Sequence, residues 1–257
     1  MKILCVGDVV GECGRKKLSE ELGAVISEKN ISLTIVNGEN LAHGRGISRK
    51  TYDELATLGV DGFTLGNHTW DNKDAAVLLM HKKNVIRPAN FQRNCPGRGS
   101  MLLKAKNGKT VGVINLSGRV YMNPCDCPFE AADRELAFLK KHTDTVLVDI
   151  HGEATSEKIA LGWYLSNKVS AVFGTHTHVQ TADEKILPGG CGYITDLGMT
   201  GPVYSVLGME RSAVIDRFVS GMPQRFSPAD GAAVMCGCIF DINDDGKAVS
   251  VERLCIE

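Results

Sequence analysis

The sequence predicts an α/β protein in which two mixed β-sheets pack on each other and helices cover their outer faces, a four-layer α/β/β/α sandwich. In the first two-thirds of the chain, apolar runs that read as strands alternate with stretches of helical periodicity, which is typical of βα units. Hairpins in the middle and at the end of the chain add antiparallel strands. No repeat, low-complexity segment or linker divides the 257 residues. We therefore expect one domain over residues 1–257.

The individual elements follow from the spacing of apolar residues. Five runs read as strands, at residues 3–8, 33–40, 62–65, 145–151 and 171–173. Helical spacing of apolar residues predicts helices over 14–29, 49–58, 72–83, 128–141 and 156–167. Residues 85–90 read as a further short strand that Pro88 closes. The Asn107-Gly108 pair predicts a hairpin between 101–105 and 110–116, and a second hairpin joins 239–242 to 248–256. We expect the last third of the chain to be mostly β.

Composition narrows the classes of function. The hydrophobic content of 43% and the charged content of 23% are ordinary for a globular protein. A net charge of −1 gives no long-range attraction to nucleic acid, which argues against a long polynucleotide partner and leaves small anionic substrates open. No signal peptide and no run of the ~20 apolar residues that a membrane span needs is present, so we expect a cytoplasmic protein with no membrane partner.

The nine cysteines are expected to be thiols in that reducing compartment. Cys125-x-Cys127 and Cys236-x-Cys238 are spaced more closely than the usual zinc ligands, and Cys236 and Cys238 would share one buried strand face. A metal or redox role is more open for the Cys125–Cys127 loop.

Side chains that can bind metal follow the five strand-like runs. They are Asp8, Glu39, Asn40, Asn67, His151, His176 and His178. Each alone has an ordinary interpretation, such as a helix cap for Asp8 or a hydrogen-bonded core residue for His151. All of them stand at the carboxyl ends of strand-like runs, which favours a shared binding site, because ligands bind where these ends meet in an open α/β sheet. His176 and His178 would face one way if both lie on a strand. The oxygen and imidazole donors suffice for two metal ions, which predicts a two-metal hydrolase.

The order of these motifs resembles the calcineurin-like metallophosphoesterases. The matching segments are Gly7-Asp8, Asn37-Gly38-Glu39-Asn40, Gly66-Asn67-His68, the strand-end His151, Gly174-x-His176-x-His178 and Thr195 to Pro202. Val10 stands where most members carry a histidine ligand, and Glu39 replaces their bridging aspartate. In both departures the chain resembles the YmdB-like branch, a family of 2′,3′-cyclic-nucleotide phosphodiesterases. The resemblance runs from Ile3 to the last strand.

The resemblance implies a ligand set for each ion. Glu39 would bridge the two ions. One ion would take Asp8, Glu39, Asn40 and His178, and the other would take Glu39, Asn67, His151 and His176. Oxygen and imidazole donors without thiolate favour iron or manganese, and the resemblance favours iron.

The implied reaction opens a 2′,3′-cyclic nucleotide to a 3′-nucleotide. A hydroxide between the metals would attack phosphorus, and His68, next to the ligand Asn67, would protonate the leaving oxygen. Arg45, Gly198 and Thr200 are weaker substrate-binding candidates, since a solvated turn explains Arg45 and a tight turn explains the other two equally well.

Two alternatives stay open at this stage. A phosphomonoesterase or nucleotidase could use the same metals, and a non-catalytic regulatory protein could use the site to sense nucleotides. A homo-oligomer is an expectation from the family alone.

Overall fold

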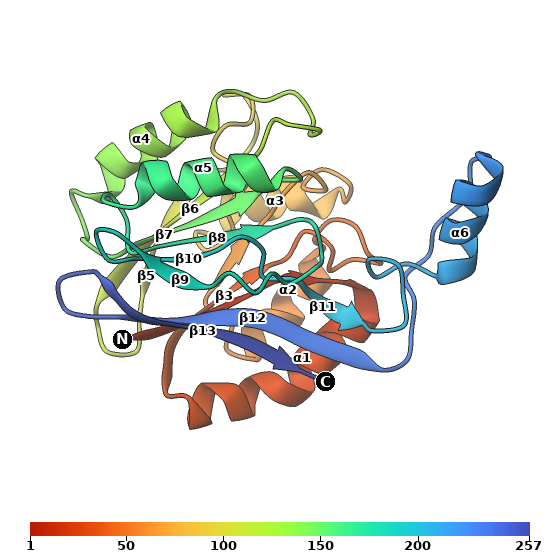
Figure 1. Cartoon of the computed structure of the whole chain (residues 1–257), viewed down its shortest axis with the longest axis horizontal. Coiled ribbons are helices and arrows are strands. Elements are labelled where there is room, and N and C mark those ends of the chain that lie inside the picture. The colour runs from red at the N-terminus through yellow and green to blue at the C-terminus, as the bar shows by residue number, and fades with distance from the viewer.

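The computed structural model describes residues 1–257 and contains two β-sheets stacked face to face with helices outside them (Figure 1). The strands are β1 (Lys2–Val6), β2 (Asp8–Val9), β3 (Ile31–Asn37), β4 (Gly62–Thr64), β5 (Ser100–Lys104), β6 (Thr110–Ser117), β7 (Val146–His151), β8 (Ala171–Thr175), β9 (Lys185–Leu187), β10 (Cys191–Ile194), β11 (Met199–Pro202), β12 (Ala233–Ile242) and β13 (Ala248–Ile256). The helices are α1 (Gly11–Glu28), α2 (Arg49–Thr57), α3 (Asp74–His81), α4 (Pro128–Leu139), α5 (Thr155–Leu165) and α6 (Arg211–Ser220). The predicted fold class is confirmed.

Both sheets are mixed. The first has the order β2-β11-β12-β1-β3-β4, with β13 paired to β12, and the second has the order β5-β6-β7-β8-β10-β9. In the first sheet β1, β3 and β4 are parallel, and β12 runs antiparallel to β1. In the second sheet β6, β7, β8 and β10 are parallel, and β5 and β9 are antiparallel edge strands. The parallel strands therefore end together within each sheet, which places their following residues at one edge.

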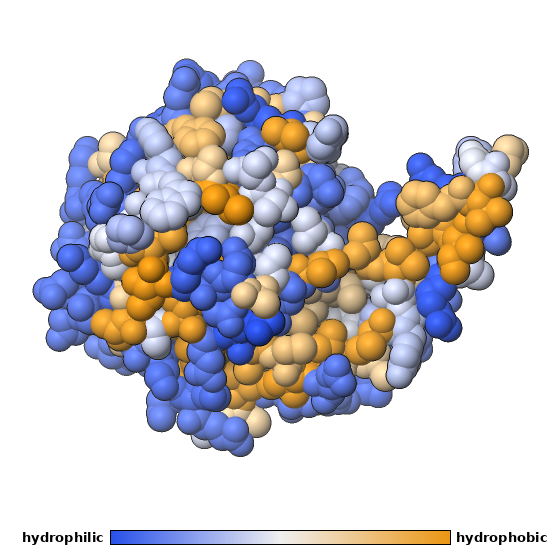
Figure 2. Space-filling model, viewed as in Figure 1, coloured by the Kyte–Doolittle hydropathy of each residue, from blue (hydrophilic) through white to orange (hydrophobic).

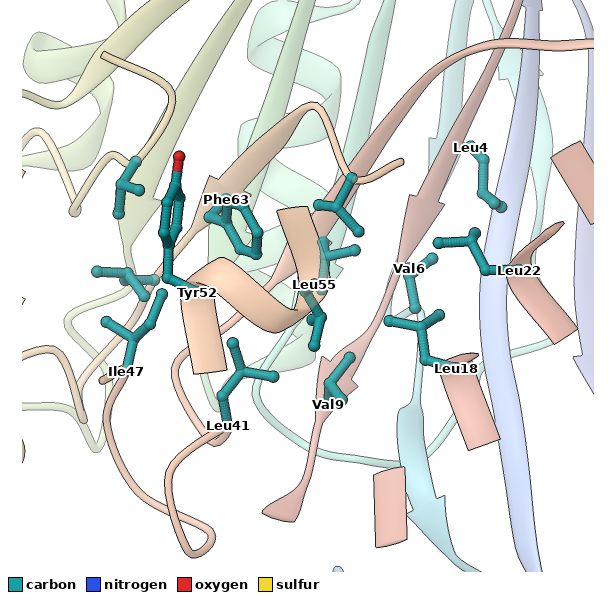
Figure 3. Packing of buried hydrophobic residues seen from close by; sticks show 14 of the residues in the cluster. Leu4, Val6, Val9, Leu18, Leu22, Leu41, Ile47, Tyr52, Leu55 and Phe63 are labelled. Carbon is teal, nitrogen blue, oxygen red and sulfur yellow. The ribbon is translucent and has the colours of Figure 1, made fainter. Parts of the chain in front are cut away.

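Three hydrophobic clusters correspond to the three interfaces between the four layers. Along β1, Leu4 and Val6 point to a cluster that includes Leu18 and Leu22 of α1 (Figure 3). Ile3 and Cys5 belong to the cluster between the sheets. A third cluster lies between the second sheet and helices α4 and α5. This alternation follows from the period of two along a strand, with both faces of β1 buried. The two sheets are thus fixed relative to each other by side chains from both.

The structure differs from the sequence prediction in two segments. Residues 85–90 do not form a strand, since Val85 makes only an isolated bridge to Phe63 and the next amides bond to separate segments. The last third is not only β: helix α6 extends away from the sheets and carries exposed apolar side chains (Figures 1 and 2). Only Val214 of α6 is buried, so the apolar side chains of this helix do not face the core.

No helix combines the length and the hydrophobicity that crossing a membrane would require. The single domain over residues 1–257 stays a prediction.

Candidate metal centre

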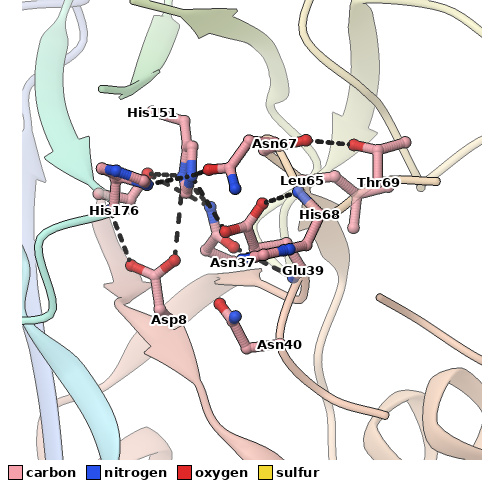
Figure 4. A network of polar contacts seen from close by, with 12 residues as sticks. Asp8, Asn37, Glu39, Asn40, Leu65, Asn67, His68, Thr69, His151 and His176 are labelled. Carbon is pink, nitrogen blue, oxygen red and sulfur yellow. Dashed lines mark hydrogen bonds and ion pairs between the residues drawn. The ribbon is translucent and has the colours of Figure 1, made fainter. Parts of the chain in front are cut away.

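The seven predicted ligands converge at the edge where the parallel strands end, and Figure 4 shows six of them, all but His178. Asp8 begins β2, Glu39 and Asn40 follow β3, Asn67 follows β4, His151 ends β7, and His176 and His178 follow β8. Both sheets therefore contribute to the site. Glu39, His151 and His176 each offer an atom within 4.8 Å of the other two. Asp8 Oδ1 lies 3.9 Å from His178 Nε2.

Three electron-pair donors surround one nitrogen of His151. Nε2 lies 3.0 Å from Glu39 Oε1, 2.9 Å from Asn67 Oδ1 and 3.0 Å from His176 Nδ1. A single N–H can satisfy one of these three neighbours well. In addition, Asp8 Oδ1 and Asn40 Oδ1 are buried without a hydrogen-bond partner, although buried polar atoms are nearly always paired. A cation would satisfy all of these donors, so the residues present fit a metal centre.

The same close contacts shift the pKa values of the ionisable groups in the pocket. Burial disfavours a charged ring, yet the carboxylates of Glu39 and Asp8 raise the pKa of His151 to about 9. Burial acts to raise the pKa of Glu39, but the His151 charge and hydrogen bonds from His151 and the His68 amide hold it at about 2. Burial and the His151 charge lower the pKa of His176 to about 3. The carboxylates of Glu39 and Asp8 thus favour a positive charge within this pocket, which a cation would also supply.

The outward nitrogens of the other two histidines also have partners. His176 Nε2 lies 3.1 Å from a carboxylate oxygen of Glu153, and His178 Nδ1 lies 3.0 Å from the Leu207 carbonyl. Because each outward nitrogen can donate to its acceptor, the nitrogen that faces the site keeps its lone pair, which is the form that binds metal.

The prediction that His176 and His178 share a strand face is wrong. Strand β8 ends at Thr175, and both histidines have left-handed backbone conformations, with φ of 99° and 63°. The turn is held by hydrogen bonds: the His176 amide donates to Asp8 Oδ2, and the amide and hydroxyl of Thr177 donate to Asp196 Oδ2. Its shape thus depends on residues distant in sequence.

Several supporting residues were not predicted from the sequence. Asp196 forms a buried ion pair with Lys158 of α5 at 2.7 Å, and Asn37, Asp149 and Thr175 form a buried polar group behind His151. A signal was present for Asn37 and Asp149, because each is a polar residue within a run of apolar strand residues. Lys158 gave no signal, since a lysine in an amphipathic helix normally faces solvent.

His68 and Arg45 line a cavity of about 230 Å³ together with Glu39, Asn40, His176 and His178. The His68 amide donates to Glu39 Oε2 at 2.9 Å, and His68 Nδ1 lies 2.9 Å from Asp71 Oδ2. This contact leaves His68 Nε2 free for a ligand. Arg45 is exposed at the rim of this cavity and pairs with no carboxylate.

Gly198 and Thr200 are not brought to the cavity. Their carbonyls accept hydrogen bonds from the amides of Asp8 and Val10, and the Thr200 hydroxyl bonds to the Cys236 carbonyl. Both residues are buried and support the backbone that carries Asp8, because β11 is the parallel partner of β2.

Gly66 is required by the crowding of the site. A Cβ at this position would lie 2.3 Å from His151 Nε2 and 2.4 Å from Glu39 Oε2. Ordinary Cβ contacts begin near 3.4 Å, so any side chain at this position would displace two of the predicted ligands.

All nine cysteines are free thiols in the structure. Cys236 and Cys238 are buried in β12, and Cys125 accepts a hydrogen bond from Asn90. The metal or redox role considered for the Cys125–Cys127 loop is not tested by these contacts.

Comparison with known proteins agrees with the fold and shows the family. The family model of the YmdB-like proteins matches residues 4–254. The chain is 48% identical over 257 residues to a 2′,3′-cyclic-nucleotide 2′-phosphodiesterase of Bacillus subtilis, covering all of this chain and 97% of the relative.

Two crystal structures are also similar over the whole fold. A hypothetical protein from Thermus thermophilus has a TM-score of 0.92 and 40% identity, covering 99% of this chain and 98% of that one. A phosphatase from Mycoplasma pneumoniae has a TM-score of 0.93 and 35% identity, covering 100% and 93% of the two chains. The sequence resemblance is thereby confirmed, and the chain belongs to the family of YmdB-like proteins.

Proposed function

We propose that this protein is a metal-dependent phosphodiesterase that hydrolyses small cyclic nucleotides, with 2′,3′-cyclic nucleotides as substrates and 3′-nucleotides as products. The observation that carries the proposal is the crowding of Glu39, Asn67 and His176 around His151 Nε2. The substrate class follows from the name of the Bacillus subtilis relative.

Two divalent ions, iron or manganese, would be held by the seven predicted ligands. Asp8, Glu39, Asn40 and His178 would hold one ion, and Glu39, Asn67, His151 and His176 would hold the other. Bound ions would supply Lewis-acid chemistry, which activates water and neutralises charge on a phosphate. Asp8 and Glu39 are the only carboxylates in this ligand set, so the loaded site keeps a net positive charge that favours an anionic substrate.

Side chains that line the cavity would bind the substrate phosphate and protonate the leaving oxygen. Arg45, exposed and without an acidic partner, would bind a phosphate oxygen. His68 would donate the proton from Nε2 to the leaving 2′ oxygen, while Asp71 accepts from Nδ1 and fixes the ring. Transfer of a proton by a positioned side chain typically contributes about 10²–10⁴-fold in rate.

The proposal is tested by metal analysis of the purified protein together with turnover of 2′,3′-cyclic AMP, 3′-AMP and an aryl phosphate. We expect the cyclic diester to be opened selectively and 3′-AMP to accumulate. His68→Ala should lower kcat by about 10²-fold or more while metal content is unchanged. Unchanged kcat in His68→Ala would refute the proton-donor role.

Phosphomonoester hydrolysis at the same site is the second candidate, because the similar Mycoplasma pneumoniae structure is described as that of a phosphatase. It predicts faster turnover of 3′-AMP and of the aryl phosphate than of the cyclic diester. Tight nucleotide binding with negligible turnover of every substrate would instead support the regulatory alternative.

A further inference from the structure

Asp149 is a fully buried acid that the proposed reaction does not use. It lies two residues before His151 on β7, and its side chain faces the first sheet. Its carboxylate accepts hydrogen bonds from Asn37 Nδ2 at 3.3 Å and from Thr175 Oγ1 at 2.8 Å, and it also accepts from the Thr64 hydroxyl. No lysine or arginine pairs with it. Such a group has a high desolvation cost, which calls for a reason for its position.

Thr175 connects this carboxylate to His151. The two residues are opposite each other in the parallel β7–β8 ladder, and Thr175 Oγ1 lies 2.9 Å from His151 Nδ1. A carboxylate only accepts hydrogen bonds, so the single hydroxyl proton of Thr175 points to Asp149. The hydroxyl oxygen must then accept from His151, and the proton of that bond resides on Nδ1.

Asn37, which lies beside Glu39 and His151 in Figure 4, fixes the direction of this chain of hydrogen bonds. Its Oδ1 accepts from the Glu39 amide at 3.2 Å, which turns Nδ2 toward Asp149 Oδ2 and Thr175 Oγ1. Asn37 Nδ2 also lies 3.4 Å from His151 Nδ1, but its two hydrogens are directed to the nearer oxygens of Asp149 and Thr175, and an amide nitrogen cannot serve as the acceptor for a reversed arrangement.

We propose that Asp149 and Thr175 are positioning residues that hold His151 in the tautomer with hydrogen on Nδ1, so that Nε2 presents its lone pair to the cation that Glu39, Asn67 and His176 would also hold. The inference rests on the proposed metal-dependent function and adds a determinant of metal affinity. With the proton on Nε2 instead, the ring would place a donor where the cation binds. Loss of such a hydrogen-bond partner typically lowers metal affinity about 10–100-fold.

The test compares three single variants of the full-length, metal-depleted protein. Thr175→Val removes the hydroxyl and keeps the β-branched shape, while Thr175→Ser keeps the hydroxyl. Thr64→Val is the matched control, because it removes another buried hydroxyl from Asp149 that does not contact His151. Mn²⁺ binding is measured by titration calorimetry without substrate, and circular dichroism verifies that each variant is folded.

We expect Thr175→Val to bind Mn²⁺ about 10–100-fold more weakly, with Thr175→Ser and Thr64→Val much closer to wild type. In zinc-loaded protein with ¹⁵N-labelled histidine, the Nδ1–H signal of His151 should be slowly exchanging in wild type and exchange faster in Thr175→Val. Wild-type affinity and an unchanged signal in Thr175→Val would overturn the inference, as would equal losses in the Val and Ser variants.

The outcome also separates this inference from the proposed function. A wild-type protein that binds Mn²⁺ and shows the expected variant pattern, yet does not hydrolyse cyclic nucleotides, would refute the function and retain the positioning role. If the wild-type protein hydrolyses cyclic nucleotides while Thr175→Val binds Mn²⁺ normally, the positioning role is refuted and the proposed function is retained. A wild-type protein that binds no Mn²⁺ would overturn both.

Discussion

Replacing Lys158 by methionine should destabilise the protein and loosen its metal centre. The Lys158–Asp196 pair is almost completely buried, with the two side chains 2% and 1% exposed. Removing one partner of a buried pair costs about 3–5 kcal/mol, because a charge is left uncompensated. Asp196 keeps hydrogen bonds from the Thr177 amide and hydroxyl and from the Gly198 amide. These bonds still stabilise the carboxylate, so we expect the lower end of that range, about 3 kcal/mol.

A loss of this size is measurable as a change in Tm. For a chain of this length each kcal/mol lowers Tm by about 2–4 °C, which predicts a decrease of about 6–12 °C for Lys158→Met. Thermal unfolding is followed by circular dichroism on metal-depleted protein, because ligands that bind the native state raise Tm by mass action. Mn²⁺ affinity should fall as well, since Asp196 holds the turn that carries His176 and His178.

The matched control is Lys29→Met, which removes an ion pair to Glu252 whose side chains are 39% and 48% exposed. Surface pairs of this kind contribute about 0–1 kcal/mol, so Tm should change little. If Lys158→Met lowers Tm no more than Lys29→Met does, the buried pair does not stabilise the fold.

Three further predictions concern the metal centre directly. Gly66→Ala should abolish Mn²⁺ binding in calorimetry, because the added Cβ would meet His151 and Glu39. The control Gly23→Ala in α1, where a Cβ would have no heavy atom within 4 Å, should bind Mn²⁺ normally. Normal binding by Gly66→Ala would contradict the crowded geometry. Glu39→Ala should lose more metal than Asn40→Ala in elemental analysis, since only Glu39 is expected to contact both ions, and equal losses would argue against the bridge. In the metal-free protein the pKa of His151 is raised to about 9, so a proton competes with the metal for this ring. The Mn²⁺ affinity should therefore rise with pH, by up to about tenfold per pH unit, and level off above pH 9. A Mn²⁺ affinity that is flat from pH 6 to 9 would contradict that competition.

The sequence was most informative where local patterns determine structure. Apolar runs that end in polar residues located β3, β7 and β8, and the shared edge of parallel strands then brought Asp8, Glu39 and His151 together. The hydrophobic periodicity of α1 and the Asn107-Gly108 turn are local signals of the same kind. The elements and the strand end at which each side chain lies needed no knowledge of how the two sheets are placed, whereas the approach of His151 from the second sheet to Asp8 and Glu39 of the first depends on that placement.

The parts that could not be predicted depend on distant partners. The left-handed turn at His176 and His178 is held by Asp8 and by Asp196, which come from other elements. The tautomer of His151 depends on Thr175, which follows it by 24 residues and lies beside it only when β7 and β8 pair. Helix α6 has apolar residues at helical spacing, but Ile215, Phe218 and Val219 are exposed and only Val214 is buried, so its position away from the sheets did not follow from that pattern.

The most direct test of a two-metal centre is anomalous X-ray scattering at the manganese edge from crystals soaked in Mn²⁺. We expect two peaks in this pocket about 3.5–4 Å apart, with Glu39 coordinating both and His151 Nε2 coordinating one of them. No peak among these seven side chains, or manganese bound only elsewhere on the protein, would contradict the two-metal centre.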